Sequence, residues 1–255
     1  MNFLKQKEAM EALGIQEISL SVIGTGSSGN GYILSCGNDK LILDCGMPFE
    51  SVLYALDYDI TSVCGVLVTH AHGDHAKHIV GYSEFFPIYT CRSVADKYGC
   101  CKYIKAKSRV QIGAFDVIPL PVPHGDCENY AYYIYHKGCG YTLFCTDAEY
   151  FPYKSLKPLP SHIIIECNYV HSKIVERLDR GEEIRSEYKS HMEVTDSIDA
   201  VKRLRSSNLQ NVVLIHKSSG NFDKEKVLSM FADELQIVPI IANKNSLINL
   251  CVYDF

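Results

Sequence analysis

Three histidines and one aspartate fall within six consecutive positions of this chain, in the stretch Thr69-His70-Ala71-His72-Gly73-Asp74-His75. The stretch follows the apolar run 63–68, a pattern typical of a buried strand. His70 and His72 are two residues apart, so an extended backbone directs both to the same side, and Asp74 and His75 approach from the turn. Imidazoles and carboxylates suit zinc, manganese and iron, and two ions need more ligands than one. The spacing predicts a two-metal site rather than surface histidines beside a turn.

Further candidate ligands follow predicted strands elsewhere in the chain. Asp44 ends the predicted strand 40–44, Asp147 follows the strand 141–146, and His216 ends the strand 211–216. His124 follows the proline-rich segment 119–123. Side chains at strand ends can meet at one edge of a sheet, so we expect these four residues to approach the histidine loop.

The composition is that of an ordinary globular protein. A hydrophobic content of 47% in 255 residues is enough for a substantial core. The chain has no run of eighteen apolar residues, and residues 1–14 mix Lys and Glu among apolar positions, so we expect a cytoplasmic protein with no membrane span or signal peptide. The eleven cysteines show no C-x-x-C spacing, which predicts buried free thiols in a reducing compartment.

Hydrophobic periodicity predicts a mixture of short strands and helices. Strands are expected at 18–23, 31–36, 40–44, 63–68, 88–90, 116–120, 130–136, 141–146, 162–166, 211–216, 236–241 and 247–252. Helices are expected at 1–14, 49–56, 76–85, 93–98, 171–189, 194–205 and 224–235. The pattern predicts an N-terminal helical extension, residues 1–16, and one domain, residues 17–255, with two β-rich halves backed by helices.

The order of these ligands along the chain resembles the metallo-β-lactamase superfamily. The resemblance implies an α+β fold, the αββα sandwich, with two metal ions between the sheets at one edge. Mapped onto this chain, it implies one metal held by His70, His72 and His124, and a second held by Asp74, His75 and His216, with Asp147 bridging the two. Asp44 would steady the histidine loop from outside the metal ligands.

Four further stretches are similar to the YycJ-type branch of this superfamily and, more distantly, to tRNase Z. They are residues 24–30, 165–168, 190–194 and 214–221, so the resemblance runs from about residue 17 to the end. It implies that His191 lies at the scissile phosphate, where it stabilises the transition state or protonates the leaving oxygen. Asp74 is the second predicted catalytic residue, and the expected phosphate contacts are Asn30, Ser218, Ser219 and Asn221. The glycine-rich loop 24–30 leads into a strand rather than a helix, which excludes a P-loop or Rossmann site.

The resulting hypothesis is a dinuclear metal-dependent hydrolase of the phosphodiesterase type. Two divalent ions, with zinc preferred and manganese or iron also compatible, would lower the pKa of a shared water and supply a bridging hydroxide. The expected substrate is a cyclic nucleotide, as in the anti-Pycsar phosphodiesterases, or a nucleic-acid end, and the relatives imply a homodimer. A glyoxalase-like thioesterase or lactonase, and a non-enzymatic metal-binding protein, stay open as alternatives.

Overall fold

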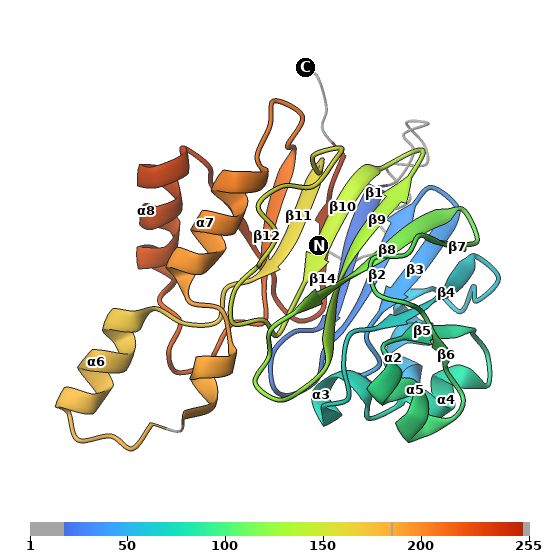
Figure 1. The fold of residues 1–255 in the computed structure, drawn as a ribbon, viewed down its shortest axis with the longest axis horizontal. Coiled ribbons are helices and arrows are strands. Elements are labelled where there is room, and N and C mark those ends of the chain that lie inside the picture. Colours follow the sequence, from blue (N-terminus) through green and yellow to red (C-terminus); the bar gives the residue numbers. More distant parts are fainter. Residues whose placement is uncertain (1–17, 185, 252–255) are drawn as a thin grey trace.

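Two seven-stranded sheets lie against each other, and helices cover their outer faces (Figure 1). The computed structural model describes residues 18–184 and 186–251, so the predicted extension 1–16 lies outside the described residues. An αββα sandwich was the fold predicted above, and the structure confirms it.

The first sheet has the strand order β14-β1-β2-β3-β4-β5-β6. Its strands are β1 (Ile18–Gly24), β2 (Gly31–Cys36), β3 (Asp39–Leu43), β4 (Val63–Val68), β5 (Ile88–Thr90), β6 (Lys102–Tyr103) and β14 (Ser246–Asn249). From β3 to β6 neighbouring strands are parallel, with Leu43 opposite Leu67 and Val68 opposite Thr90. Parallel strands end at the same edge of a sheet, so the residues after β3 and β4 are neighbours.

The second sheet has the order β13-β12-β11-β10-β9-β8-β7. Its strands are β7 (Val110–Ile112), β8 (Phe115–Val122), β9 (Asn129–His136), β10 (Gly140–Cys145), β11 (His162–Glu166), β12 (Asn211–Ile215) and β13 (Ile240–Ile241). β10 to β13 are parallel, and two antiparallel pairings through β9 give β8 the same direction as β10. The ends of β8, β10, β11 and β12 therefore share one edge.

Each sheet is covered by its own set of helices (Figure 1). The first set is α2 (Phe49–Ala55), α3 (Gly73–Ala76), α4 (Ile79–Ser83) and α5 (Arg92–Tyr98). The second sheet is covered by α7 (Val194–Leu204) and α8 (Lys224–Leu235), whereas α6 (His171–Asp179) lies beyond the end of the sheet (Figure 1). The 3-10 helix η1 (Ser186–Ser190) comes between α6 and α7 in the chain. Among the helices in the described ranges, none combines the length and the hydropathy that crossing a membrane requires.

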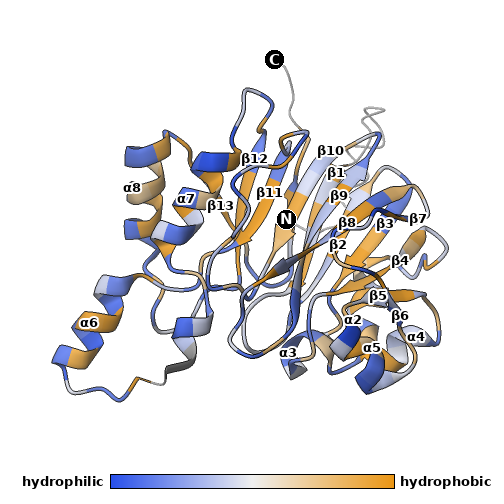
Figure 2. Ribbon diagram, viewed as in Figure 1, coloured by the Kyte–Doolittle hydropathy of each residue, from blue (hydrophilic) through white to orange (hydrophobic). Residues whose placement is uncertain are grey.

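Apolar side chains fill the spaces on both sides of the second sheet, and Figure 2 shows the hydrophobic colouring along the central strands. Between the sheets, the buried rings of Tyr32 and Phe144 meet edge to face with centroids 5.5 Å apart. On the outer face, α7 buries Val194, Ile198 and Val201 because these residues recur at helical spacing along one side. The edge that carries the strand ends is thus backed by rigid, packed layers.

Several predicted element boundaries are wrong for local reasons. The helix predicted at 76–85 is split, since α3 ends at Ala76 and the His78 N–H bonds to the Cys45 carbonyl in the neighbouring loop. The helix predicted at 171–189 stops at Asp179, just before Gly181 takes a positive φ of 76°. The strand predicted at 236–241 keeps only its last two residues, because Gln236 forms the left-handed cap of α8.

Cys36 and Cys139 form a disulfide, which corrects the prediction that the cysteines are free thiols. The bond joins the end of β2 to the turn between β9 and β10, with the two Cα atoms 6.0 Å apart. The partners are 103 residues apart in the chain, so no local spacing could have revealed the pair. The other nine cysteines are free.

Candidate metal centre

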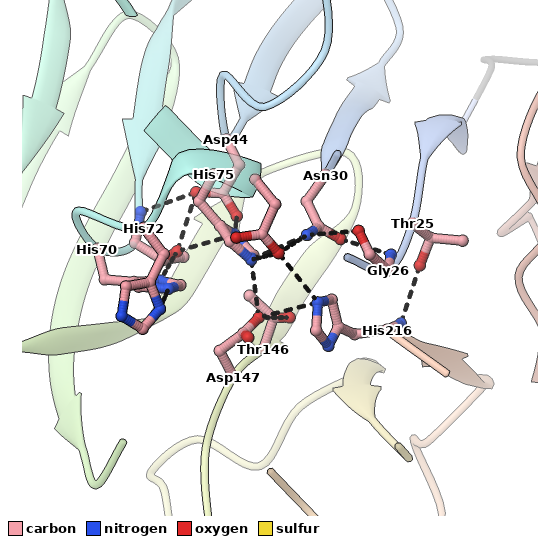
Figure 3. Close-up of polar contacts among 12 residues, drawn as sticks. Thr25, Gly26, Asn30, Asp44, His70, His72, His75, Thr146, Asp147 and His216 are labelled. Carbon is pink, nitrogen blue, oxygen red and sulfur yellow. Dashed lines mark hydrogen bonds and ion pairs between the residues drawn. The ribbon is translucent and has the colours of Figure 1, made fainter. Parts of the chain in front are cut away.

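Loops from both sheets bring the seven predicted ligands to one edge of the sandwich. Figure 3 shows His70, His72, His75, Asp147 and His216 among them. His70 and His72 lie in the loop after β4, and Asp74 and His75 lie in the short helix α3 that this loop enters. The second sheet contributes His124 after β8, Asp147 after β10 and His216 after β12. The residues form two groups, each with donor atoms within 4.8 Å of one another.

The first group consists of His70, His72 and His124. The Nδ1 atom of His72 lies 3.0 Å from His70 Nε2 and 3.1 Å from His124 Nε2. Three ring nitrogens that point at one another can share hydrogens only in part, whereas a cation between them would satisfy all three lone pairs. The group has the nitrogen donors that zinc and other divalent transition metals prefer.

The second group consists of Asp74, His75, Asp147 and His216. Asp147 Oδ2 lies 2.9 Å from His75 Nε2 and 3.5 Å from His216 Nε2, while Asp74 Oδ2 lies 3.4 Å and 3.6 Å from the same two nitrogens. The other oxygen of Asp147 faces the first group, 3.9 Å from His124 Nε2. One carboxylate therefore lies between the two groups.

Hydrogen bonds to residues outside the two groups determine which ring nitrogen of His75, His124 and His216 faces the centre. His75 Nδ1 lies 2.7 Å from Asp44 Oδ2, His124 Nδ1 lies 2.8 Å from the Ser190 carbonyl, and His216 Nδ1 lies 3.0 Å from Glu166 Oε1. These acceptors take the Nδ1 hydrogen, so Nε2 of each ring faces the centre and is the nitrogen that can bind a metal ion. Asp44 Oδ1 also accepts the Thr69 N–H at 2.8 Å, so Asp44 braces the histidine loop at two points.

Three of the strand-end residues have a left-handed backbone. The φ angles are 65° at Asp44, 50° at Asp147 and 51° at His216. Residues with a Cβ adopt this region at an energetic cost, and such residues collect at functional sites because the surrounding structure holds them there. In this chain the left-handed step turns the backbone just beyond β3, β10 and β12, where each side chain joins the centre.

The electrostatics of the centre are those of buried charges that stabilise one another. Burial lowers the pKa of His75, but the Asp147 and Asp44 carboxylates outweigh it and hold that pKa well above its ordinary value. In the same way Asp147, Asp74 and Glu166 overcome burial and raise the pKa of His216 to about 10. The charged imidazoles in turn hold the pKa of Asp147 well below its ordinary value despite its burial.

Glu166 is a buried residue of the centre that the sequence reasoning did not single out. It ends β11, and its Oε1 lies 2.7 Å from His191 Nδ1 as well as 3.0 Å from His216 Nδ1. His191 Nδ1 also lies 3.4 Å from Asp147 Oδ1, and its ring stacks on that of His216 with centroids 5.1 Å apart. A lone carboxylate that directly follows the apolar run 163–165 was the available signal, because a buried charge needs a partner.

Two of the four predicted phosphate contacts, Asn30 and Asn221, are buried. Asn30 is fully buried, and its amide bonds to Gly26 and lies 2.8 Å from His75 Nε2. The Ser218 hydroxyl accepts the Asn221 N–H at 3.2 Å, and Asn221 Oδ1 accepts from Arg177. Ser219 is exposed. Asn30 thus ties the loop after β1 to the centre, and Ser218 shapes the turn after His216.

The donors fit divalent metal ions. His216 Nε2 is buried, faces two carboxylates and has no hydrogen-bond partner in the described part of the chain, so a metal ion could take the place of the hydrogen that this nitrogen carries in the charged imidazole. A buried polar atom without a partner is costly unless something else satisfies it, and a cation would do so for this nitrogen and for the three facing nitrogens of the first group. The histidine and aspartate groups are therefore suited to divalent metals, and the donor types do not select a particular one.

The fold is that of the metallo-β-lactamase proteins, as the resemblance implied. The metallo-β-lactamase fold protein YhfI from Bacillus subtilis superposes with a TM-score of 0.67 over 91% of this chain and 98% of that one, at 17% sequence identity.

Similarity in sequence to known proteins covers part of the chain. The family described as Anti-Pycsar protein Apyc1 matches residues 18–86. An Anti-Pycsar protein Apyc1 from Paenibacillus xerothermodurans is 34% identical over 74 residues, which are 27% of this chain and 28% of that protein. The exodeoxyribonuclease YycJ of Bacillus anthracis is 35% identical over 63 residues, 24% of each chain. The two relatives are thus matched over about a quarter of their own length. The residues that the family matches, 18–86, include the histidine loop but not His124, Asp147, His191 or His216.

Proposed function

We propose that this protein is a dinuclear metal-dependent hydrolase that cleaves phosphodiesters. The observation that carries the proposal is the pair of ligand groups on either side of Asp147, with His191 beside them. The fold and the similarity to an anti-Pycsar protein and to an exodeoxyribonuclease support it.

In this proposal His70, His72 and His124 hold one ion, and Asp74, His75 and His216 hold the other, with Asp147 shared. Two bound divalent ions would lower the pKa of a water molecule between them and neutralise charge on a phosphate oxygen. Asp44, Ser190 and Glu166 keep the inward nitrogens in place through the Nδ1 contacts described above. We take zinc as the native metal, with manganese or iron as the alternatives to test.

His191 is the group we assign to the leaving oxygen. Glu166 accepts its Nδ1 hydrogen at 2.7 Å, so Nε2 is the nitrogen left to face a substrate. The side chain keeps 19% of its surface exposed, whereas His75 is fully buried and His216 is nearly so. His191 is therefore an imidazole that can reach a bound phosphate and donate a proton to the oxygen that departs.

Two substrate classes follow from the relatives, a cyclic nucleotide and the end of a nucleic acid. The test loads metal-free protein separately with Zn²⁺ and Mn²⁺ and supplies 3′,5′-cyclic mononucleotides, single-stranded oligonucleotides, a thioester and a lactone. We expect turnover of at least one of the phosphodiesters, and loss of that turnover in His124→Ala. Activity confined to the thioester or the lactone would establish the glyoxalase-like alternative instead.

A His191 variant distinguishes a phosphodiesterase from the thioesterase or lactonase alternative further. His191→Ala should lower kcat on a phosphodiester by about 100-fold, the usual contribution of a positioned acid, with metal content unchanged. Full phosphodiesterase activity in this variant would remove the assignment. Homodimer formation and a cytoplasmic location stay predictions, to be tested by mass in solution and by fractionation.

A further inference from the structure

A second cluster of metal-binding side chains lies at the edge of the sandwich opposite the candidate metal centre. Cys36, His136 and Cys139 are all buried, and each offers a donor atom within 4.8 Å of those of the other two. The end of β2 in the first sheet supplies Cys36, and the hairpin of β9 and β10 in the second sheet supplies His136 and Cys139. We call these three residues the Cys–His cluster.

The Cys–His cluster is separate from the candidate metal centre. Cys139 directly precedes β10, whereas Asp147 follows the other end of that strand. The six residues of β10 span about 20 Å, since a strand rises about 3.3 Å per residue. The two sites are therefore too far apart to share an ion.

The imidazole of His136 is held in the manner of a metal-binding histidine. Its Nδ1 accepts the Gly138 N–H at 3.1 Å, and its Nε2 lies 3.1 Å from Asp39 Oδ2. The lone pair is therefore on Nδ1, and Nε2 donates its hydrogen to Asp39. Histidines that bind metals commonly donate their second ring N–H to a carboxylate in this way. Gly138 directly precedes Cys139, so Nδ1 faces the turn that carries one of the two cysteines.

The two sulfurs of the cluster are joined in the structure as the Cys36–Cys139 disulfide. The other nine cysteines of the chain are free thiols. Cysteines stay free in reducing surroundings, where dithiols break disulfides by exchange. A disulfide that serves only as a cross-link needs neither an imidazole nor a carboxylate beside it, whereas zinc binds thiolates and imidazoles together.

We propose that the Cys–His cluster binds a zinc ion when its disulfide is reduced. A dithiol attacks the Cys36–Cys139 bond, its own two sulfurs become joined, and the two cysteines are left as thiols. Zn²⁺ then replaces the two thiol protons, which pass to the solvent, and takes the His136 Nδ1 lone pair in place of the Gly138 N–H. Water completes the tetrahedron, and Cα atoms 6.0 Å apart allow both sulfurs to reach one ion at about 2.3 Å.

The ion would take over the link that the disulfide makes between the two sheets. Cys36 belongs to the first sheet, and His136 and Cys139 belong to the second, so either the covalent bond or the ion joins them. Asp39 connects the cluster to the solvent, since 39% of its side chain is exposed. The sandwich therefore keeps a cross-link at this edge in both the oxidised and the reduced form.

Cobalt tests the inference, because Co²⁺ bound by thiolates absorbs in the near ultraviolet by charge transfer from sulfur. The donors of the candidate metal centre are nitrogen and oxygen, so an ion bound there gives no such band. The full chain is reduced with dithiothreitol, freed of the reductant by gel filtration under argon and titrated with Co²⁺, beside a sample that keeps the disulfide. We expect the band in the reduced protein, no band in the oxidised protein, and loss of the band when Zn²⁺ is added.

Variants assign the band to the Cys–His cluster. Cys139→Ser should abolish it. His136→Ala keeps both sulfurs, and it should weaken Co²⁺ binding by at least about tenfold, because even the loss of a residue that only orients a ligand commonly costs that much. The matched control is Cys100→Ser, which should keep the band: Cys100 and Cys101 are a second pair of neighbouring thiols, with sulfurs 3.8 Å apart.

Several results would overturn the inference. They are the absence of the band although thiol titration finds two further thiols after reduction, loss of the band in Cys100→Ser but not in Cys139→Ser, and wild-type Co²⁺ affinity in His136→Ala. Unfolding of the reduced protein with Zn²⁺ present, seen by circular dichroism, would also count against it. If Cys139→Ser does not fold, His136→Ala decides. The band reports sulfur ligands alone, so this inference stands or fails independently of phosphodiester cleavage.

Discussion

Replacing Glu166 with glutamine tests how far the candidate centre depends on a residue outside the proposed metal ligands. Glu166 Oε1 accepts from His191 at 2.7 Å and from His216 at 3.0 Å, and Oε2 accepts the Ala148 N–H at 2.8 Å. Glutamine has the same shape but only one acceptor oxygen. Its NH₂ group must then face either the two imidazoles or the Ala148 N–H, and in both cases a buried donor loses its partner.

The cost follows from these contacts. Loss of the partner that orients a metal-binding histidine commonly lowers metal affinity by about 10- to 100-fold, or about 1.4 to 2.7 kcal/mol. Glu166 also raises the pKa of His191, against the opposing effect of burial. In Glu166→Gln that pKa falls, so the protonated form of His191 is lost at lower pH. The limb of the kcat profile that declines as pH rises should therefore move to lower pH.

Competition with a chromogenic chelator measures the metal affinity. Steady-state assays across the pH range measure the pH at which kcat declines. Glu176→Gln on α6 is the matched control, since among the described residues its carboxylate pairs with Lys173 on that helix and with Arg180 at its end, away from the centre. Wild-type metal affinity together with an unshifted limb in Glu166→Gln would refute the reasoning.

Three further predictions follow from other parts of the structure. In Gly46→Ala the added Cβ would lie 1.7 Å from the Asp74 carbonyl oxygen, so the histidine loop must shift. We expect urea unfolding to show a stability loss of about 1–3 kcal/mol, and we expect weaker metal binding. Wild-type values in both measurements would contradict this. The pKa of His75 is raised and that of His216 is about 10, so both side chains are protonated at pH 7 without metal. Metal binding should therefore tighten as pH rises and release about two protons, which calorimetry in buffers of different ionisation enthalpy measures. Binding without proton release would contradict this prediction. Burial lowers the pKa of His162 from 6.5 to about 4, so its contribution to stability is complete above pH 6.5 and is lost as pH falls through 4, a change of about 3 kcal/mol. Unfolding free energies of wild type and His162→Gln should therefore converge or cross between pH 7 and pH 4, and a constant difference would exclude this role.

The histidine loop could be predicted from sequence because its chemistry is local. Alternation at the end of an apolar run places His70 and His72 on one side, and this needs no knowledge of the rest of the fold. Asp44, Asp147 and His216 could be marked as strand-end residues, but their grouping came from the family resemblance. Their left-handed backbones have no local signature, because tertiary contacts rather than residue type hold them there.

Glu166 and the Cys36–Cys139 pair were missed for a related reason. Each is meaningful only through a partner that is distant in the chain: Glu166 contacts His216 fifty residues on, and the cysteines are 103 residues apart. Periodicity reports which face of an element is buried, but it does not report what that face meets.

Each candidate metal group takes ligands from both sheets, and this couples metal binding to the integrity of the sandwich. The first sheet supplies His70 and His72 to one group, and the second sheet completes it with His124. Asp74 and His75 likewise require Asp147 and His216 from across the interface. Neither sheet alone has a complete set, so an ion binds the packed form and not the separated halves. By mass action the stabilisation is RT ln(1 + [metal]/Kd), about 4 kcal/mol at a metal concentration 1,000 times the Kd. The His124→Ala variant keeps the second group intact, so it should lose only part of this stabilisation. The Asp147 side chain faces both groups, so the Asp147→Ala variant should lose more.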